Sequence, residues 1–342
     1  MRSPILTIAC ACLAGCLAGL GCKPEIGNPP SLITGPTILA VRGEPAEAAA
    51  GQPVTYELLA VDVDGPIPAV NSVLSDPAQW AVCTVPKPPT ESNAVAKQCL
   101  DTASLPGAPG ATLTTFESPM LDNACSLFGP IAPPVQGDQP AIQPRAPDIT
   151  GGYYLPVRVS IAIPLGLRRP GMATPDTLVG FALERISCGL ANAPAAELTQ
   201  YNKTYTRNQN PVISQLTWKQ GNGDAVPLAP VVPGAFPVTQ ISLSGGPVAF
   251  ELSWPDAAAE TYPAFDIGAR ELYLTREALR VAWFVTSGKF DHDTTGRTEY
   301  DYNLSVTNRL TLDTLGPVNL WAVLHDSRGG VAFAYYAIEA TP

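Results

Sequence analysis

One strand pattern occurs twice in the chain, and it constrains the fold more than any other feature. The two copies are GQPVTYELLAVD at 51–62 and GGPVAFELSWPD at 245–256. Both share Gly-x-Pro-Val-x-aromatic-Glu-Leu, with an Asp at the same offset. Val, the aromatic residue and Leu alternate with other residues, which is typical of a strand with one buried face. The preceding Gly and Pro indicate a turn. The repeat therefore predicts two similar β-rich halves.

Each copy is followed by a strand that contains tryptophan. These strands are QWAVC at 79–83 and LRVAWFV at 279–285, and in the second the residues Leu, Val, Trp and Val share one face. Alternation also predicts strands elsewhere, and the chain ends in a predicted hairpin that turns at 325–330. The further strands and the two short helices are expected at 157–163, 304–312, 318–324, 331–338, and at 94–100 and 195–201.

These patterns predict an all-β protein made of two tandem immunoglobulin-like β-sandwich domains after a signal peptide. The first half exceeds the roughly 100 residues of a minimal sandwich. We assign the excess to a Pro- and Gly-rich insertion at about 84–150, expected to be irregular and held by disulfides. The predicted segments are a signal peptide at 1–21, a tether at 22–35, domains at 36–199 and 212–342, and a polar linker at 200–211.

Two motifs of the second half carry a family resemblance. Residues 318–338, VNLWAVLHDSRGGVAFAYYAI, resemble the closing strands of PKD-type and cadherin-like immunoglobulin domains, where V-x-L-x-V-x-D-x-x-G-G recurs. Residues 281–290, VAWFVTSGKF, are similar to the W-x-F strand of those domains but lack the Gly-Asp-Gly turn that follows it. The resemblance covers the second domain well and the first only through the repeat. It implies a fold and supplies no active site.

The amino terminus has the form of a lipoprotein signal. One Arg precedes 17 uncharged residues, 5–21, which end at Cys22-Lys23. We assign Cys22 as the acylated residue because apolar sequence turns polar there. Cys16, after Leu-Ala-Gly, is the alternative, but it would leave an apolar mature terminus. An uncleaved membrane-spanning anchor is the second alternative, although the segment is shorter than the ~20 residues that a spanning helix needs.

Acylation would anchor the protein in a membrane, because each buried CH₂ contributes roughly 0.8 kcal/mol. The layout resembles envelope lipoproteins of high-GC Gram-negative bacteria. Lys23 stands where an Asp commonly retains such proteins at the inner membrane, so we expect the outer membrane, with the face undetermined. The net charge of −10 argues against nucleic acid as a partner, because binding to phosphates needs a basic surface. The expected partners are the membrane, through the lipid, and other envelope proteins or glycans.

The cysteines of the mature body number four. Of eight in the chain, Cys10, Cys12 and Cys16 would leave with the signal and Cys22 would be acylated. In an exported protein the remaining four predict two disulfides. Cys83 with Cys99 closes a short Pro-containing loop, which leaves Cys125 with Cys188. A metal site is the alternative, but Cys-x-x-Cys spacing is lacking and both histidines are far away in sequence.

No sequence pattern predicts catalysis, a cofactor or a resident metal. The two histidines, His292 and His325, lie in predicted turns, and there is no Gly-x-Ser-x-Gly motif. Ser327 is near His325, but adjacent turn residues rarely align as nucleophile and base. A glycosidase needs a carboxylate pair, and nothing in the sequence singles one out. We therefore expect a non-enzymatic structural, adhesion or interaction scaffold.

A glycan-binding surface module, with or without the assistance of calcium, is the alternative function. Residues 291–296, DHDTTG, have carboxylates spaced as in calcium loops but lack later ligands, and Asp-Gly sequences also make ordinary turns. Two comparable fragments are 62–65 and Asp326. An aromatic sugar face and a sandwich core are both compatible with one set of residues, Trp218, Trp254, Trp321, Tyr335 and Tyr336. Trp80 and Trp283 are predicted core residues.

Overall fold

The computed structural model describes most of the chain after the leader. The described ranges are 28–67, 78–88, 90–93, 95–100, 114–129, 148–163, 176–232 and 238–342. The predicted signal peptide at 1–21 and Cys22 lie outside the described residues. No helix in the described ranges is long and apolar enough to cross a membrane.

The first sandwich is formed by two four-stranded sheets. In one sheet the central strand β3 pairs with β1, β4 and β6. In the other the order is β2-β8-β7-β5. The bounds are β1 Thr37–Glu44, β2 Glu47–Ala48, β3 Pro53–Asp62, β4 Gly65–Pro66, β5 Gln79–Val82, β6 Thr115–Pro119, β7 Gly152–Ala162 and β8 Thr177–Ser187.

The second sandwich has two five-stranded sheets, of order β10-β9-β12-β18-β16 and β11-β20-β19-β15-β17. The first of these sheets contains β9 Gln215–Gln220, β10 Val226–Leu228, β12 Val248–Ser253, β16 Lys289–Phe290 and β18 Ser305–Thr311. The other contains β11 Val238–Ser242, β15 Leu279–Val285, β17 Thr294–Arg297, β19 Gly316–Asp326 and β20 Val331–Thr341. The strands thus form an all-β fold of immunoglobulin-like sandwiches, as predicted.

The repeated motif supplies a central strand to each sandwich, β3 in the first and β12 in the second. The Val, aromatic and Leu positions of both copies are buried: Val54, Tyr56, Leu58, Val248, Phe250 and Leu252. In the first core Trp80 lies 5.5 Å from the ring of Phe116, and in the second Trp283 lies 5.6 Å from the ring of Phe290. Both tryptophans are fully buried, which confirms them as core residues.

The insertion is more ordered than predicted. Within 84–150 the structure has the 3-10 helix η1 (Lys97–Cys99), strand β6 and the helix α2 (Ala124–Phe128). Strand β6 pairs with β3, and Phe116 is buried in the sandwich core. The expectation of an irregular excursion was therefore wrong for β6 and α2, and β6 completes a sheet of the sandwich.

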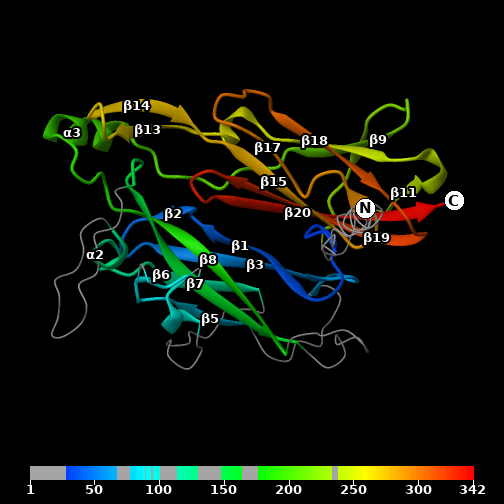
Figure 1. Ribbon diagram of the computed structural model, residues 1–342, viewed down its shortest axis with the longest axis horizontal. Coiled ribbons are helices and arrows are strands. Elements are labelled where there is room, and N and C mark those ends of the chain that lie inside the picture. Colours follow the sequence, from blue (N-terminus) through cyan, green and yellow to red (C-terminus); the bar gives the residue numbers. More distant parts are fainter. Residues whose placement is uncertain are drawn as a thin grey trace, which may run out of the picture.

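A two-stranded hairpin joins the sandwiches at one end of the molecule. It consists of β13 (Thr261–Asp266) and β14 (Glu271–Arg276), and it lies beside the helix α3 (Ala195–Thr204). Figure 1 shows α3, β13 and β14 at one end of the long axis, with β9, β11 and the C-terminus at the other. Two short 3-10 helices, η4 (Leu243–Gly245) and η5 (Asp256–Ala258), complete the second half.

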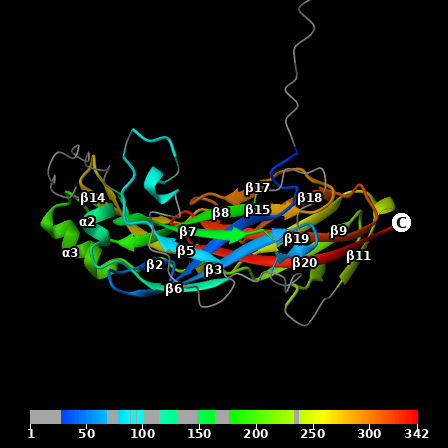
Figure 2. The same ribbon diagram turned by 90° about the horizontal axis from the view of Figure 1, so that it is seen from below.

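The two sandwiches pack against each other side by side, through the outer faces of one sheet from each (Figures 1 and 2). Strand β19 shows why, because its alternate residues Leu320 and Ala322 face its own core while Trp321 and Val323 face the first sandwich. The apolar interface comprises Ile33, Ala40, Leu59, Val61, Trp321, Val323 and Val331. A strand buried on both faces reads as a continuous apolar run, which explains the sequence LWAVL.

The chain contacts the second sandwich before it builds the first. The N–H of Ile33 donates to the carbonyl of Val285 at 2.8 Å, and the N–H of Val285 donates to the carbonyl of Ser31 at 2.8 Å. Residues 31–33 therefore pair in parallel with the end of β15, and β1 begins a few residues later, at Thr37. The segment that precedes the first sandwich is consequently bonded to the second sandwich.

Candidate functional site at the domain junction

The polar segment that follows α3 runs between the two sandwiches, with Asn208 buried and Thr206, Arg207 and Gln209 exposed. The sequence predicted a linker at 200–211, whereas α3 continues to Thr204 and residues 205–210 bond to both domains. Asn208 is only 1% exposed, and its N–H donates to Glu47 while its side chain donates to Asp326. The polar groups of residues 205–210 therefore connect the two domains, where the sequence predicted only a polar linker.

On the side of the first sandwich, Glu47 is the centre of the network. It lies at 0% exposure on β2, and one of its carboxylate oxygens accepts from Arg185 Nε at 3.0 Å. The same oxygen accepts from the Tyr205 hydroxyl at 2.6 Å and from the N–H of Asn208 at 2.9 Å. The Ser187 hydroxyl donates to the other oxygen at 2.6 Å. Glu47 thus has the several partners that a buried carboxylate needs.

Arg328 is the matching group on the second sandwich. It lies in the turn between β19 and β20, and its side chain is 1% exposed. Its Nε donates to Glu277 at 2.6 Å and its Nη2 donates to Glu260 at 2.7 Å. Its guanidinium also lies 4.3 Å from the ring centroid of Tyr262. The carboxylates of Glu260 and Glu277 and the ring of Tyr262 thus fix the guanidinium in one orientation.

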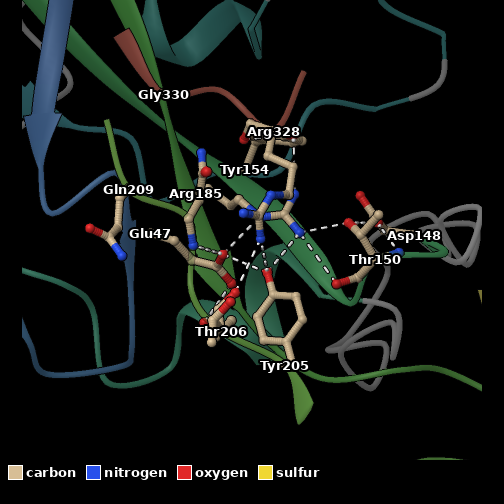
Figure 3. Close-up of polar contacts among 12 residues, drawn as sticks. Glu47, Asp148, Thr150, Tyr154, Arg185, Tyr205, Thr206, Gln209, Arg328 and Gly330 are labelled. Atoms are coloured by element: carbon tan, nitrogen blue, oxygen red, sulfur yellow. Dashed lines mark hydrogen bonds and ion pairs between the residues drawn. The ribbon is translucent and has the colours of Figure 1, made fainter. Parts of the chain in front are cut away.

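Tyr205 joins the two halves of this network (Figure 3). Its hydroxyl oxygen accepts from Arg185 Nη2 at 3.3 Å and from Arg328 Nη1 at 3.4 Å, while its proton goes to Glu47. Arg328 Nη1 also donates to the carbonyl of Thr206 at 3.2 Å. One phenol therefore lies in contact with a buried arginine from each domain.

Two glycines make room for these side chains. A Cβ on residue 152 would lie 2.0 Å from Arg185 Cζ, so only glycine lets that guanidinium lie against the backbone of β7. A Cβ on residue 330 would lie 2.0 Å from Asp326 Oδ2. Asp326 Oδ1 accepts the N–H groups of Arg328 and Gly330, both at 2.8 Å, which closes the turn. This confirms the interpretation of the Asp326 fragment as a turn.

The carboxyl groups of the network differ in their electrostatics. Burial alone would raise the pKa of Glu47, but the charge of Arg185 and the hydrogen bonds from Ser187, Tyr205 and Asn208 together lower it. Burial, followed by the nearby charge of Asp326, raises the pKa of Glu277 to about 8, although Arg328 opposes the shift. Glu277 lies near the like charge of Asp326 and accepts fewer hydrogen bonds than Glu47, and these two differences account for the opposite directions of the pKa shifts.

A pocket of about 330 Å³ opens beside the network. It is lined by Asp148, Ile149, Thr150, Tyr154, Arg185, Tyr262, Ser327 and Arg328. Most of its polar groups are already engaged: Arg185 bonds Thr150 and Tyr154, and the Ser327 hydroxyl accepts the N–H of Ala278 at 3.3 Å. We therefore interpret the junction as a structural contact that fixes the two domains relative to each other.

The four predicted disulfide cysteines are paired as the sequence predicted. The Cα atoms of Cys83 and Cys99 are 5.6 Å apart, and those of Cys125 and Cys188 are 5.4 Å apart. The first pair connects the end of β5 to η1, and the second connects α2 to the end of β8. Both pairs lie in the first sandwich, and they attach parts of the insertion to its sheets.

The candidate catalytic and metal-binding residues are not brought together. His325 lies within strand β19, not in a turn as predicted, and burial lowers its pKa. No hydrogen bond joins it to Ser327 in the described part of the chain. His292 lies between β16 and β17, where its N–H donates to Asn308 at 3.3 Å. Across the described ranges, no three His, Cys, Asp or Glu side chains form a group that could hold a metal ion.

The aromatic residues that were compatible with either a sugar-binding face or a sandwich core are mostly buried. Trp254, Trp321 and Tyr336 are 2% exposed or less, so they serve the core and the domain interface. Tyr335 is half-buried and stacks on Trp321 at 5.4 Å. Trp218 is also half-buried and packs against the second core. The expectation of a sandwich core is thus confirmed for Trp254 and Tyr336, while Trp321 lies at the domain interface.

No family model and no curated protein matches the chain. Among solved structures, the D00-D0 domain of Intimin aligns over 92% of this chain and 98% of that one, at 9% identity and a TM-score of 0.23. Fibronectin(III)-like modules of Clostridium thermocellum CbhA align over 88% of this chain and 94% of that one, at 9% identity and a TM-score of 0.19. Scores this low carry no argument, so the fold rests on the strands and sheets described above.

Proposed function

We propose that this chain is a non-enzymatic envelope lipoprotein, anchored through Cys22, that holds two immunoglobulin-like domains in one fixed relative orientation. The observation that carries the proposal is the junction, where Tyr205 contacts a buried arginine from each domain. A flexible linker would need none of these contacts. A protein that presents surfaces to partners at a set distance and angle does need them.

The cost of burying this network supports a role for fixed geometry. Arg185 and Arg328 are each 1% exposed, and taking such charges out of water costs several kcal/mol per ion before their partners compensate. Buried ion pairs of this kind add little net stability, yet breaking one is strongly destabilising. They therefore favour one arrangement of the domains over nearby alternatives. This property suits a structural or adhesion scaffold.

The proposal is tested by measuring the distance between the domains. Spin labels at the exposed positions Glu117 and Lys219, one in each sandwich, should give a single narrow distance distribution by pulsed EPR. Tyr205→Ala combined with Asn208→Ala should broaden it, because the contacts of Tyr205 with a buried arginine from each domain and the hydrogen bond from the Asn208 side chain to Asp326 are lost.

The matched control replaces an exposed tyrosine and an exposed asparagine away from the junction, by Tyr300→Ala with Asn222→Ala. This control should leave the distribution unchanged. A broad distribution in the wild-type protein would contradict the proposal, and so would an unchanged one in the junction variant. Turnover of cell-wall or polysaccharide substrates that is lost on changing one residue would contradict the non-enzymatic part.

A further inference from the structure

The hairpin strand β14 has an open edge. It pairs only with β13 in the described part of the chain. The N–H of Phe265 on β13 donates away from β14, to the carbonyl of Ile149 at 2.7 Å, and Pro263 has no N–H to donate. Because the hydrogen-bonding direction alternates along an antiparallel pair, their partners Leu272 and Leu274 also direct their backbone groups away from the hairpin.

Only one end of this edge is covered. The N–H of Leu272 donates to the carboxylate of Glu197 on α3 at 3.1 Å. The N–H and C=O of Leu274 have no hydrogen-bond partner among the described residues. Its side chain is 71% exposed, and that of the adjacent Tyr273 is 43% exposed. Proteins usually block an open edge with charged side chains, Pro or a bulge. Strand β14 has charged residues only at its two ends, Glu271 and Arg276, and none of these features between them.

An aromatic group lies at the end of the same strand. Tyr302 is 71% exposed, and its ring lies 5.0 Å from the guanidinium of Arg276, the last residue of β14. Arg276 is itself fixed by Asp256 at 2.8 Å. Nearby, Asp301 is tied to Arg297 at 2.9 Å, which holds the loop that carries Tyr302. The edge therefore offers the free backbone groups and exposed side chain of Leu274, with an exposed tyrosine at the end of the strand.

The charges around the edge decide which occupant fits. Acidic groups outnumber basic ones there: Glu197, Asp256, Glu271 and Asp301 against Arg270, Arg276 and Arg297. Arg276 and Arg297 are already paired with Asp256 and Asp301. A second copy of this chain would bring the same unpaired carboxylates together, within a protein of net charge −10. An extended segment with basic ends would be attracted instead.

We propose that β14 binds an extended segment of another protein as an added strand, with alternating apolar side chains toward Leu274 and Tyr302 and Lys or Arg near Glu197 and Glu271. This inference rests on the scaffold function proposed above and names the class of partner. The edge also lies away from the point where the N-terminal segment joins the second sandwich. Residues 31–33 pair with Val285 at the far end of β15, and that strand is about 20 Å long at ~3.3 Å per residue.

The probe is the terminally blocked peptide Lys-Val-Thr-Val-Thr-Val-Lys. It is titrated into the wild-type protein while the amide NMR signals of residues 271–276 are followed. Two matched peptides accompany it, one with Glu in place of both Lys and one with N-methyl groups at all three Val. We expect the shift changes to centre on Leu274. Affinity should fall about tenfold or more when either the basic ends or the backbone donors are removed.

Two variants locate the binding on the protein. Leu274→Pro removes the outward N–H and leaves the hydrogen bonds between β13 and β14 in place. Leu274→Lys keeps the N–H but places a charge on the edge. Leu315→Lys is the matched control, because Leu315 is a 60% exposed leucine outside every strand. Both Leu274 variants should weaken binding about tenfold, whereas the control should not.

Three outcomes would overturn the proposal. The first is equal binding by the wild type and both Leu274 variants, and the second is no shift change at millimolar concentrations of any peptide. The third is dimerisation of the protein in sedimentation experiments that Leu274→Pro abolishes, which would identify a second copy as the occupant. The inter-domain distance distribution is measured on the same variants. If it stays narrow while binding fails, the docking inference is refuted and the scaffold proposal stands.

Discussion

Glu184 is a carboxylic acid in the core of the first sandwich, and replacing it with glutamine gives a sharp test of this core. Glu184 lies on β8 and is 4% exposed, and its Oε1 has no hydrogen-bond partner in the described part of the chain. The other oxygen lies against β1, where a Cβ on Gly43 would come within 2.1 Å of it. Burial, with smaller contributions from the charges of Glu47 and Glu44, raises the pKa of Glu184 from 4.5 to about 9.

The raised pKa of Glu184 determines how the free energy of unfolding changes with pH. Between pH 4.5 and pH 9 the folded protein keeps a proton on Glu184 that the unfolded chain releases. The free energy of unfolding therefore falls as pH rises through this window. Each pH unit corresponds to ~1.36 kcal/mol, so Glu184 should cost the wild type about 4 kcal/mol between pH 5 and pH 8. Glu184→Gln keeps the size and polarity of the side chain and removes this loss.

Urea unfolding of the wild type and the variant at pH 5 and pH 8 provides the measurement. The difference in unfolding free energy between the two proteins should change by about 4 kcal/mol in favour of the variant at the higher pH. Glu117→Gln, at an exposed glutamate of the same sandwich, is the control and should follow the wild type. Parallel pH profiles for wild type and Glu184→Gln would refute the reasoning, because they would mean that Glu184 is ionised in the folded protein.

Three further predictions follow from the interface, the junction and the leader. Trp321→Ala should lower the free energy of unfolding by about 3–5 kcal/mol in urea, because a fully buried indole at the domain interface is lost. Gly152→Ala should broaden the inter-domain distance distribution, because its methyl group would displace the guanidinium of Arg185. Cys22→Ser should abolish incorporation of radiolabelled palmitate and release the protein into the soluble fraction; retained labelling would instead favour Cys16.

The strands and cores could be predicted because their signal is local. The alternation of Val, aromatic and Leu at 53–58 and 247–252 depends only on which face of a strand is buried, and both copies face their cores. The disulfide pairing followed from loop length and from elimination. Strand β6 escaped prediction because its TFESP sequence lacks a clear alternation, and its place in the sheet depends on pairing with β3.

The junction could not be predicted because composition does not distinguish a solvated polar residue from a buried and paired one. Residues 205–210, YTRNQN, look like a solvent-exposed linker, yet Asn208 is buried because Glu47 and Asp326 from different domains accept its hydrogen bonds. Two local signals were available. The Gly151-Gly152 pair at the start of a strand and Gly330 after Asp326 each mark a place where a side chain lies close to the backbone.

The path of the chain explains how anchor, junction and docking edge can act together. Residues 31–33 join β15 of the second sandwich, and the same sandwich carries the β13–β14 hairpin. A chain anchored at Cys22 would therefore transmit force from the membrane to the hairpin through one domain, without passing through the first. The first sandwich packs along the outer face of β19 and β20 and is tied back by Tyr205. We expect it to act on the hairpin through α3, which contacts β13 and β14 and carries Glu197, so breaking the junction at Tyr205 should also weaken the binding of a peptide to β14.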